Sequence, residues 1–173
     1  MSLTQNLLDQ LSPNTITEYH ERHDAYTVAA GKLYVHMVSE TRVINISRQI
    51  DTVLTTKVVK LEGTNTFIVF VFGNKTMQTV AVQPGKDARP YEDLRFDFEL
   101  SCVELISQPH QEGSHQQSLT FFLGSVCGKV HHLGLTVRGH SADQLSFDAQ
   151  PRIIFESAHP GQSLTSKMYM GFQ

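Results

Sequence analysis

Strict alternation of apolar and polar residues between positions 94 and 102 is the feature that most constrains the fold. Each apolar residue is followed by a polar one, in the order Leu94-Arg95-Phe96-Asp97-Phe98-Glu99-Leu100-Ser101-Cys102. Successive side chains of a β-strand point to opposite faces, so such a segment buries one face and exposes the other. In a helix, the same apolar residues would be spread around the circumference. The pattern therefore predicts an antiparallel sheet with one solvated face.

Short apolar or β-branched segments recur along the rest of the chain, separated by turn residues. The segments are 25–29, 32–38, 42–46, 53–61, 66–72, 76–82, 119–126, 133–137, 145–149, 153–155 and 166–172. Their spacing of about 8–12 residues predicts an all-β protein. We expect an antiparallel sandwich or flattened barrel of about eight to ten short strands.

Four local patterns refine this expectation. Segment 66–72 is apolar on both faces, as expected of a central strand that is covered on both sides. The turn residues Gly73-Asn74-Lys75 predict a hairpin between 66–72 and 76–82. Near Val103 the alternation shifts phase, which predicts a β-bulge. The polar segment 107–118 is expected to be a surface loop.

Both ends of the chain are apolar, and we expect them to make contacts. A short helix is predicted over residues 1–12, before Pro13, and it is too short to be stable alone. We expect it to dock on the sheet or on a neighbouring subunit. Its apolar stripe consists of Leu3, Leu7, Leu8 and Leu11. The apolar tail, which would complete a sheet or add to the edge of another subunit, contains Met168, Tyr169, Met170 and Phe172.

Size and charge narrow the class of protein. The 173 residues are expected to form a single β domain over 1–173. The 14 basic and 17 acidic residues leave a net charge of −3. This balance gives no indication that the domain as a whole binds nucleic acid or acidic lipid through its net charge. No apolar run reaches the length of a membrane span, and no signal peptide is evident. We therefore expect a soluble, intracellular, cytoplasmic protein.

Nine histidines are the unusual count in the composition. His20 and His23 have a spacing that one helical turn could direct at a metal, and His131 and His140 could add ligands for zinc or iron. His131 and His132 are adjacent, so on a strand only one of them could enter a shared site. The favoured interpretation is scattered surface histidines with no cofactor. A second alternative is pH sensing, because histidine titrates near pH 6.5.

The segment Gly124-Ser125-Val126-Cys127-Gly128 is the other candidate for chemistry. It is similar to the nucleophile turn of chymotrypsin-like cysteine proteases, in which backbone N–H groups form an oxyanion hole. His36 would then be the base, and Glu62 or Asp51 would orient it. The spacing departs from the GxCGG pattern of such enzymes, and Cys127 also continues the apolar run 121–123. An ordinary turn cysteine is the simpler interpretation.

The absence of a complete catalytic motif favours a non-catalytic role. The charged residues Arg95, Asp97 and Glu99 share one strand face and are interpreted as a solvated surface. We expect a structural or interaction protein, similar in general profile to viral coat and matrix proteins. It would bind protein partners, chiefly copies of itself, through sheet faces and edges. The alternatives are a β-barrel that binds a small ligand and a cysteine hydrolase built on Cys127.

Overall fold

The computed structural model describes residues 16–19, 25–29, 31–36, 40–61, 64–107, 116–138 and 146–156. Throughout these residues the protein is all-β and antiparallel, as the alternation predicts. Thirteen strands are present there, two of which have only two residues, so they outnumber the eight to ten expected. The chain forms two compact units, residues 1–48 and 49–173. The single domain expected over 1–173 stays a prediction.

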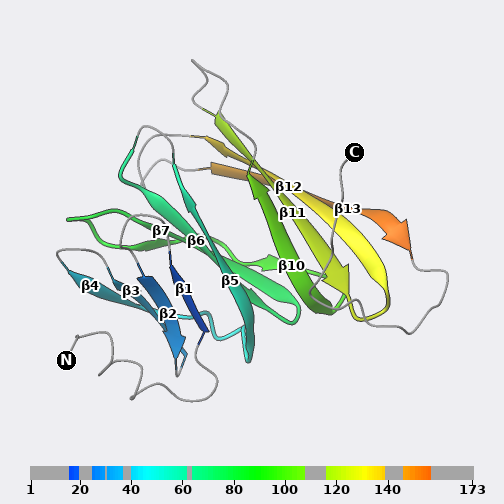
Figure 1. Ribbon diagram of the computed structural model, residues 1–173, viewed down its shortest axis with the longest axis horizontal. Coiled ribbons are helices and arrows are strands. Elements are labelled where there is room, and N and C mark those ends of the chain that lie inside the picture. Colours follow the sequence, from blue (N-terminus) through cyan, green and yellow to red (C-terminus); the bar gives the residue numbers. More distant parts are fainter. Residues whose placement is uncertain are drawn as a thin grey trace. The chain divides into compact units, whose positions relative to one another are not determined.

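The first unit contains a four-stranded antiparallel sheet (Figure 1). Its strands lie in chain order, as β1 (Ile16–Tyr19), β2 (Ala25–Ala29), β3 (Lys32–His36) and β4 (Thr41–Asn45). On β3, Leu33 and Val35 are buried. Lys32, the first residue of the strand, is exposed. Strand β1 was not predicted, because its sequence mixes polar and apolar residues without a clear two-residue period.

The second unit begins with a five-stranded sheet. Its strands are β5 (Val53–Lys60), β6 (Phe67–Gly73), β7 (Thr76–Val82), β8 (Arg89–Pro90) and β9 (Leu94–Arg95). The hairpin predicted around Asn74 is confirmed, because β6 pairs with β7 across that turn. Every residue of β6 is buried, which confirms the central strand expected from its two apolar faces.

The same unit continues with a four-stranded sheet, again in chain order. Its strands are β10 (Leu100–Ser107), β11 (Gln116–Ser125), β12 (Lys129–Arg138) and β13 (Ser146–Glu156). Strand β11 begins at Gln116, inside the segment expected to be a loop. Strand β13 joins the two predicted segments 145–149 and 153–155 through Pro151. Proline lacks the N–H donor but is tolerated here because β13 is the edge of the sheet.

Side chains from both sheets of the second unit form one shared core. Phe121 of β11 lies at its centre, with its ring centroid 4.9 Å from that of Phe70 and 5.4 Å from that of Phe72. The planes of Phe70 and Phe121 meet at 71°, the edge-to-face arrangement that aromatic pairs prefer. Two packed sheets with a filled interior make this unit a β-sandwich.

The alternating segment 94–102 does not form the continuous strand that its sequence predicts. Strand β9 pairs with β7, the chain bends at residues 97–98, and β10 then pairs with β11. The bend is held by backbone bonds from Phe96 N–H to the Lys75 carbonyl and from Leu100 N–H to the Asn74 carbonyl. The segment thus crosses from one sheet to the other. The burial alternation survives, because Phe96 and Leu100 are buried while Asp97 is exposed.

Other expectations have different outcomes. The bulge predicted near Val103 is present as a register shift between Leu100 and Cys102. The helix over residues 1–12 and the apolar tail 166–172 lie outside the described residues. So do the interaction residues predicted on them. Among the residues that are described, none forms a helix long and apolar enough to cross a membrane.

Candidate interaction face

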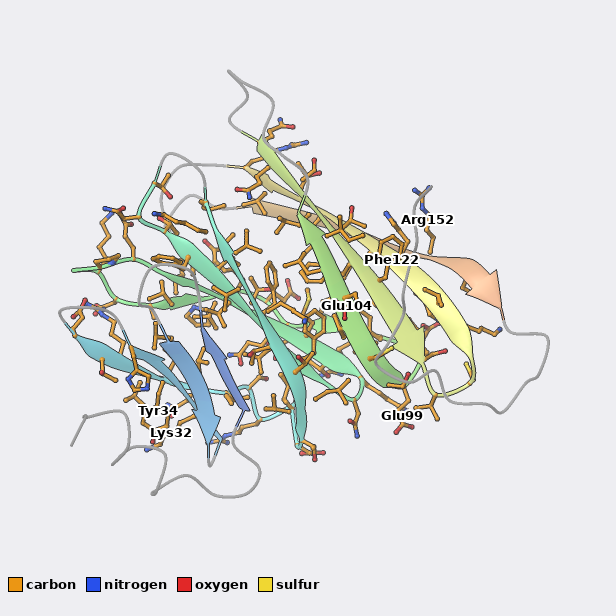
Figure 2. The ribbon with its side chains drawn as sticks, in the orientation of Figure 1. Lys32, Tyr34, Glu99, Glu104, Phe122 and Arg152 are labelled. Carbon is orange, nitrogen blue, oxygen red and sulfur yellow. The ribbon has the colours of Figure 1, made fainter. Side chains whose placement is uncertain are left out.

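A row of four residues crosses the outer face of the β10–β13 sheet, one from each strand. Glu104 on β10 lies opposite Phe122 on β11, and Phe122 lies opposite His132 on β12. His132 in turn lies opposite Arg152 on β13. Directly opposed residues of an antiparallel pair share one face of the sheet. We call this set the cross-strand row; Figure 2 labels Glu104, Phe122 and Arg152 in order across the sheet.

The cross-strand row lies on the face turned away from the core. The neighbours of Phe122 in the chain, Phe121 and Leu123, are fully buried and belong to the core of the sandwich. Because side chains alternate along a strand, Phe122 must point the other way. It is only half-buried there, as is His132. The outer face therefore carries an aromatic pair that the sandwich does not need for its interior.

The centre of the row is an aromatic pair between two glycines. The rings of Phe122 and His132 meet edge to face, with centroids 5.9 Å apart and planes at 74°. Gly124 and Gly134 occupy the next outer-face positions on β11 and β12 and add no side chains. A Cβ atom at Gly134 would lie 3.4 Å from Cε1 of His132. Nδ1 of His132 is buried and has no hydrogen-bond partner among the described residues.

The two ends of the row carry opposite charges. Glu104 and Arg152 are both exposed, and neither has a hydrogen bond or ion pair within the described part of the chain. Three strand spacings, about 14 Å, separate their positions. This distance is too long for them to pair with each other within one chain. The row therefore has an acidic end, a basic end and an aromatic centre.

His131 lies on the opposite, inner side of β12, as expected of two adjacent strand residues. Its ring stacks on Phe98 with centroids 3.5 Å apart and planes at 6°. Burial lowers the pKa of His131, the nearby Asp97 carboxylate opposes this shift, and Lys129 adds to it. Nε2 of His131 is buried without a hydrogen-bond partner in the described structure. An uncharged, stacked imidazole of this kind is a packing residue.

The metal hypothesis gains no support from the described residues. His20, His23 and His140 lie outside them. His131 is buried, with a relative exposure of 6%, and its ring stacks on that of Phe98. In the described ranges, no three side chains of histidine, cysteine, aspartate or glutamate gather closely enough to hold a metal ion.

Cys127 lies in the turn between β11 and β12, and its thiol is exposed. The thiol contacts the Ser125 hydroxyl at 3.1 Å, and that hydroxyl also donates to the carbonyl of Lys129 and accepts from its N–H. Gly128 follows with a φ of 84°, a conformation that favours glycine and closes the turn. The serine and the glycine around Cys127 are therefore explained by the structure of the turn.

The other proposed members of the hydrolase site belong to different units of the chain. His36 belongs to the first unit, where its Nδ1 lies 3.2 Å from the Thr41 hydroxyl. Asp51 is an exposed residue of the second unit, and Glu62 lies outside the described residues. Among the described residues, neither a histidine nor a carboxylate bonds to the Cys127 thiol. The hydrolase stays a prediction.

Comparison with other proteins leaves the site to be judged on its geometry. No known protein family matches the chain, and no curated protein matches it significantly. The cross-strand row was missed by the sequence analysis because its members are 18, 10 and 20 residues apart along the chain. Only the register of the strand pairs brings them together. Gly134 inside an otherwise regular strand was the one available signal.

Proposed function

We propose that this chain is a non-catalytic interaction protein that self-associates through the outer face of the β10–β13 sheet. The observation that carries the proposal is the charge pattern of the cross-strand row, which is complementary to itself. The acidic end is Glu104, the basic end is Arg152, and the aromatic pair lies between them. A closed dimer with two-fold symmetry is the commonest way for a chain to satisfy such a surface.

The symmetry axis that suits the row runs along the strands, between β11 and β12. Rotation about this axis stacks a second copy face to face and reverses the order of its strands. Glu104 and Arg152 each lie one and a half strand spacings, about 7 Å, from the axis. Each Glu104 would therefore face Arg152 of the second copy. Phe122 would face His132 of the second copy at the centre.

The neighbouring outer-face positions are also compatible with this arrangement. Gly124 pairs with Val130 across β11 and β12, so the same rotation sets Gly124 against Val130 of the second copy. Likewise, Thr120 pairs with Gly134 and would face Gly134 of the second copy. The half-buried Thr120 thus meets a glycine of the second copy, whereas Gly124 and Val130 are already buried within one chain.

The size of the face predicts a weak dimer. Four strands about 4.8 Å apart, with about ten residues each, give a face of about 19 Å by 33 Å. Two such faces bury roughly 1,250 Å², at the lower end of the roughly 1,200–2,000 Å² of specific interfaces. We therefore expect association that depends on protein concentration.

Both cysteines are free thiols, which supports a reducing compartment such as the cytoplasm.

Charge reversal at the two ends of the row tests the proposal. Glu104→Arg would place two basic residues opposite each other at both ends of the dimer, and Arg152→Glu would place two acidic residues there. Each variant is expected to dimerise about tenfold more weakly than the wild type, or worse. Light scattering coupled to size-exclusion chromatography over a concentration series measures this constant.

Restoring complementarity is the decisive control. The double variant E104R/R152E has its charges exchanged and is expected to regain dimerisation. An equimolar mixture of E104R and R152E should form heterodimers, since every facing pair is again of opposite charge. A wild type that stays monomeric at all concentrations overturns the proposal. So does an unchanged dimerisation constant in both single variants.

A further inference from the structure

Strands β3 and β4 of the first unit carry a second exposed face with a different chemistry. On β3, Lys32, Tyr34 and His36 alternate with the buried residues Leu33 and Val35. Lys32 is exposed, and the two ring residues are half-buried. Figure 2 labels Lys32 and Tyr34 on this strand. One strand thus presents a cation and two rings in succession on a single face.

The two rings have the geometry of a stacking platform. The rings of Tyr34 and His36 are nearly parallel, with planes at 11° and centroids 6.5 Å apart. Burial lowers the pKa of His36, so its ring is uncharged at neutral pH. On β4, Val43 lies opposite Tyr34 and is 53% exposed. An exposed apolar side chain, that of Val43, therefore lies beside the Tyr34 ring.

Among the described side chains of this face, which belong to β3 and β4, none is acidic, although the chain contains 17 acidic residues. The register of β3 and β4 places six positions on this face. They are Lys32, Tyr34, His36, Thr41, Val43 and Asn45. The carboxylate of Glu40, beside β4, lies 3.3 Å from the Arg42 guanidinium.

We propose that this face binds single-stranded nucleic acid. Two successive bases would stack on Tyr34 and His36, and Lys32 would contact a phosphate. Stacking on exposed rings is how sheet surfaces hold unpaired bases, and it tolerates any base because each has a flat face. The described side chains of this face include one lysine and no acidic residue, which suits a polyanion. The net charge of −3 excludes a grip by the whole domain but not a local platform.

The single cation sets the expected strength. With about one phosphate contact, the logarithm of the binding constant should fall with the logarithm of salt concentration with a slope of about −0.7. Most of the affinity must then come from stacking. The tyrosine hydroxyl contributes little to stacking, so Tyr34→Phe should bind like the wild type. Tyr34→Ala should weaken binding about tenfold.

Fluorescence anisotropy of the full chain with a labelled oligouridylate of about ten nucleotides, at about 50 mM salt, tests this proposal. Y34A and H36A are each expected to bind about tenfold more weakly, while Y34F keeps the wild-type affinity. Val126→Ala, at an exposed apolar residue of the second unit outside the cross-strand row, is the control and should not change binding. Circular dichroism verifies that each variant is folded, and Lys32→Gln should flatten the salt dependence.

Several results would overturn the inference. One is equal affinity of Y34A and Y34F, since stacking would then be irrelevant. Another is competition by inorganic polyphosphate as strong as that by unlabelled oligonucleotide, which would reduce the interaction to charge. A third is retention on an oligosaccharide array with no response to the oligonucleotide. Dimerisation of the second unit is measured separately, so failure here leaves that proposal standing.

Discussion

Strands β6 and β12 are the two contrasting central strands of the second unit. Every residue of β6 is buried, on both faces of its sheet. Along residues 131–137 of β12 only the inner face is fully buried, and Gly134 and Thr136 alternate with buried Leu133, Leu135 and Val137. A strand covered on both sides has no side chain free for another task. The half-covered strand does, and its outer face holds the cross-strand row.

The contrast separates structural from functional side chains. Phe70 and Phe122 are both phenylalanines at the centre of a sheet. Phe70 is fully buried and packs against Phe121, whereas Phe122 is half-buried beside His132. Removing the first should cost stability, and removing the second should mainly affect association. Three pairs of substitutions test this distinction.

The largest effect is expected for Phe70→Ala. Deleting a fully buried phenylalanine leaves a cavity and removes the edge-to-face contact with Phe121, at a cost of about 3–5 kcal/mol. Phe122→Ala should cost about 1 kcal/mol or less, because its ring is only half-buried. Urea unfolding of both variants measures the difference. Equal losses would mean that the outer face is as structural as the core.

A pair of strand glycines gives a smaller effect. A Cβ atom at Gly73, the last residue of β6, would lie 3.0 Å from Cγ2 of Ile50 and 3.3 Å from the Thr52 carbonyl oxygen. Gly73→Ala should therefore destabilise the protein by about 1–3 kcal/mol through overpacking. Gly134→Ala meets only an ordinary contact of 3.4 Å with His132 and should change stability by about 0.5 kcal/mol at most. Thermal unfolding distinguishes the two.

The smallest effect is expected in the pH dependence of stability. The two residues compared are His131 and His132, which lie on opposite faces of β12. Burial lowers the pKa of His131 below its unfolded value of about 6.5. The unfolded chain then binds a proton first as the pH falls, so stability should decrease below about pH 6.5 and level off below the folded pKa. His131→Phe should remove this part of the slope. His132→Phe is the control, and an identical slope in His131→Phe would refute the assignment.

Much of the fold could be predicted from local patterns. Two-residue periodicity identified most strands, and turn residues such as Asn74 marked the β6–β7 hairpin. Burial on both faces of 67–72 followed from its apolar sequence. Strand β1 was missed for lack of periodicity, and β13 was predicted as two separate segments, 145–149 and 153–155. These errors arise because pairing partners can override a weak local signal.

The alternation of buried and exposed residues follows from the amino-acid sequence, since side-chain direction along a strand is fixed by backbone geometry. The sequence does not specify which strand lies beside which. The packing of the sheets makes 94–102 bend from one sheet to the other. It also places Glu104, Phe122, His132 and Arg152 in one row. Strand register depends on long-range packing, and a shift of one residue would move every side chain to the other face.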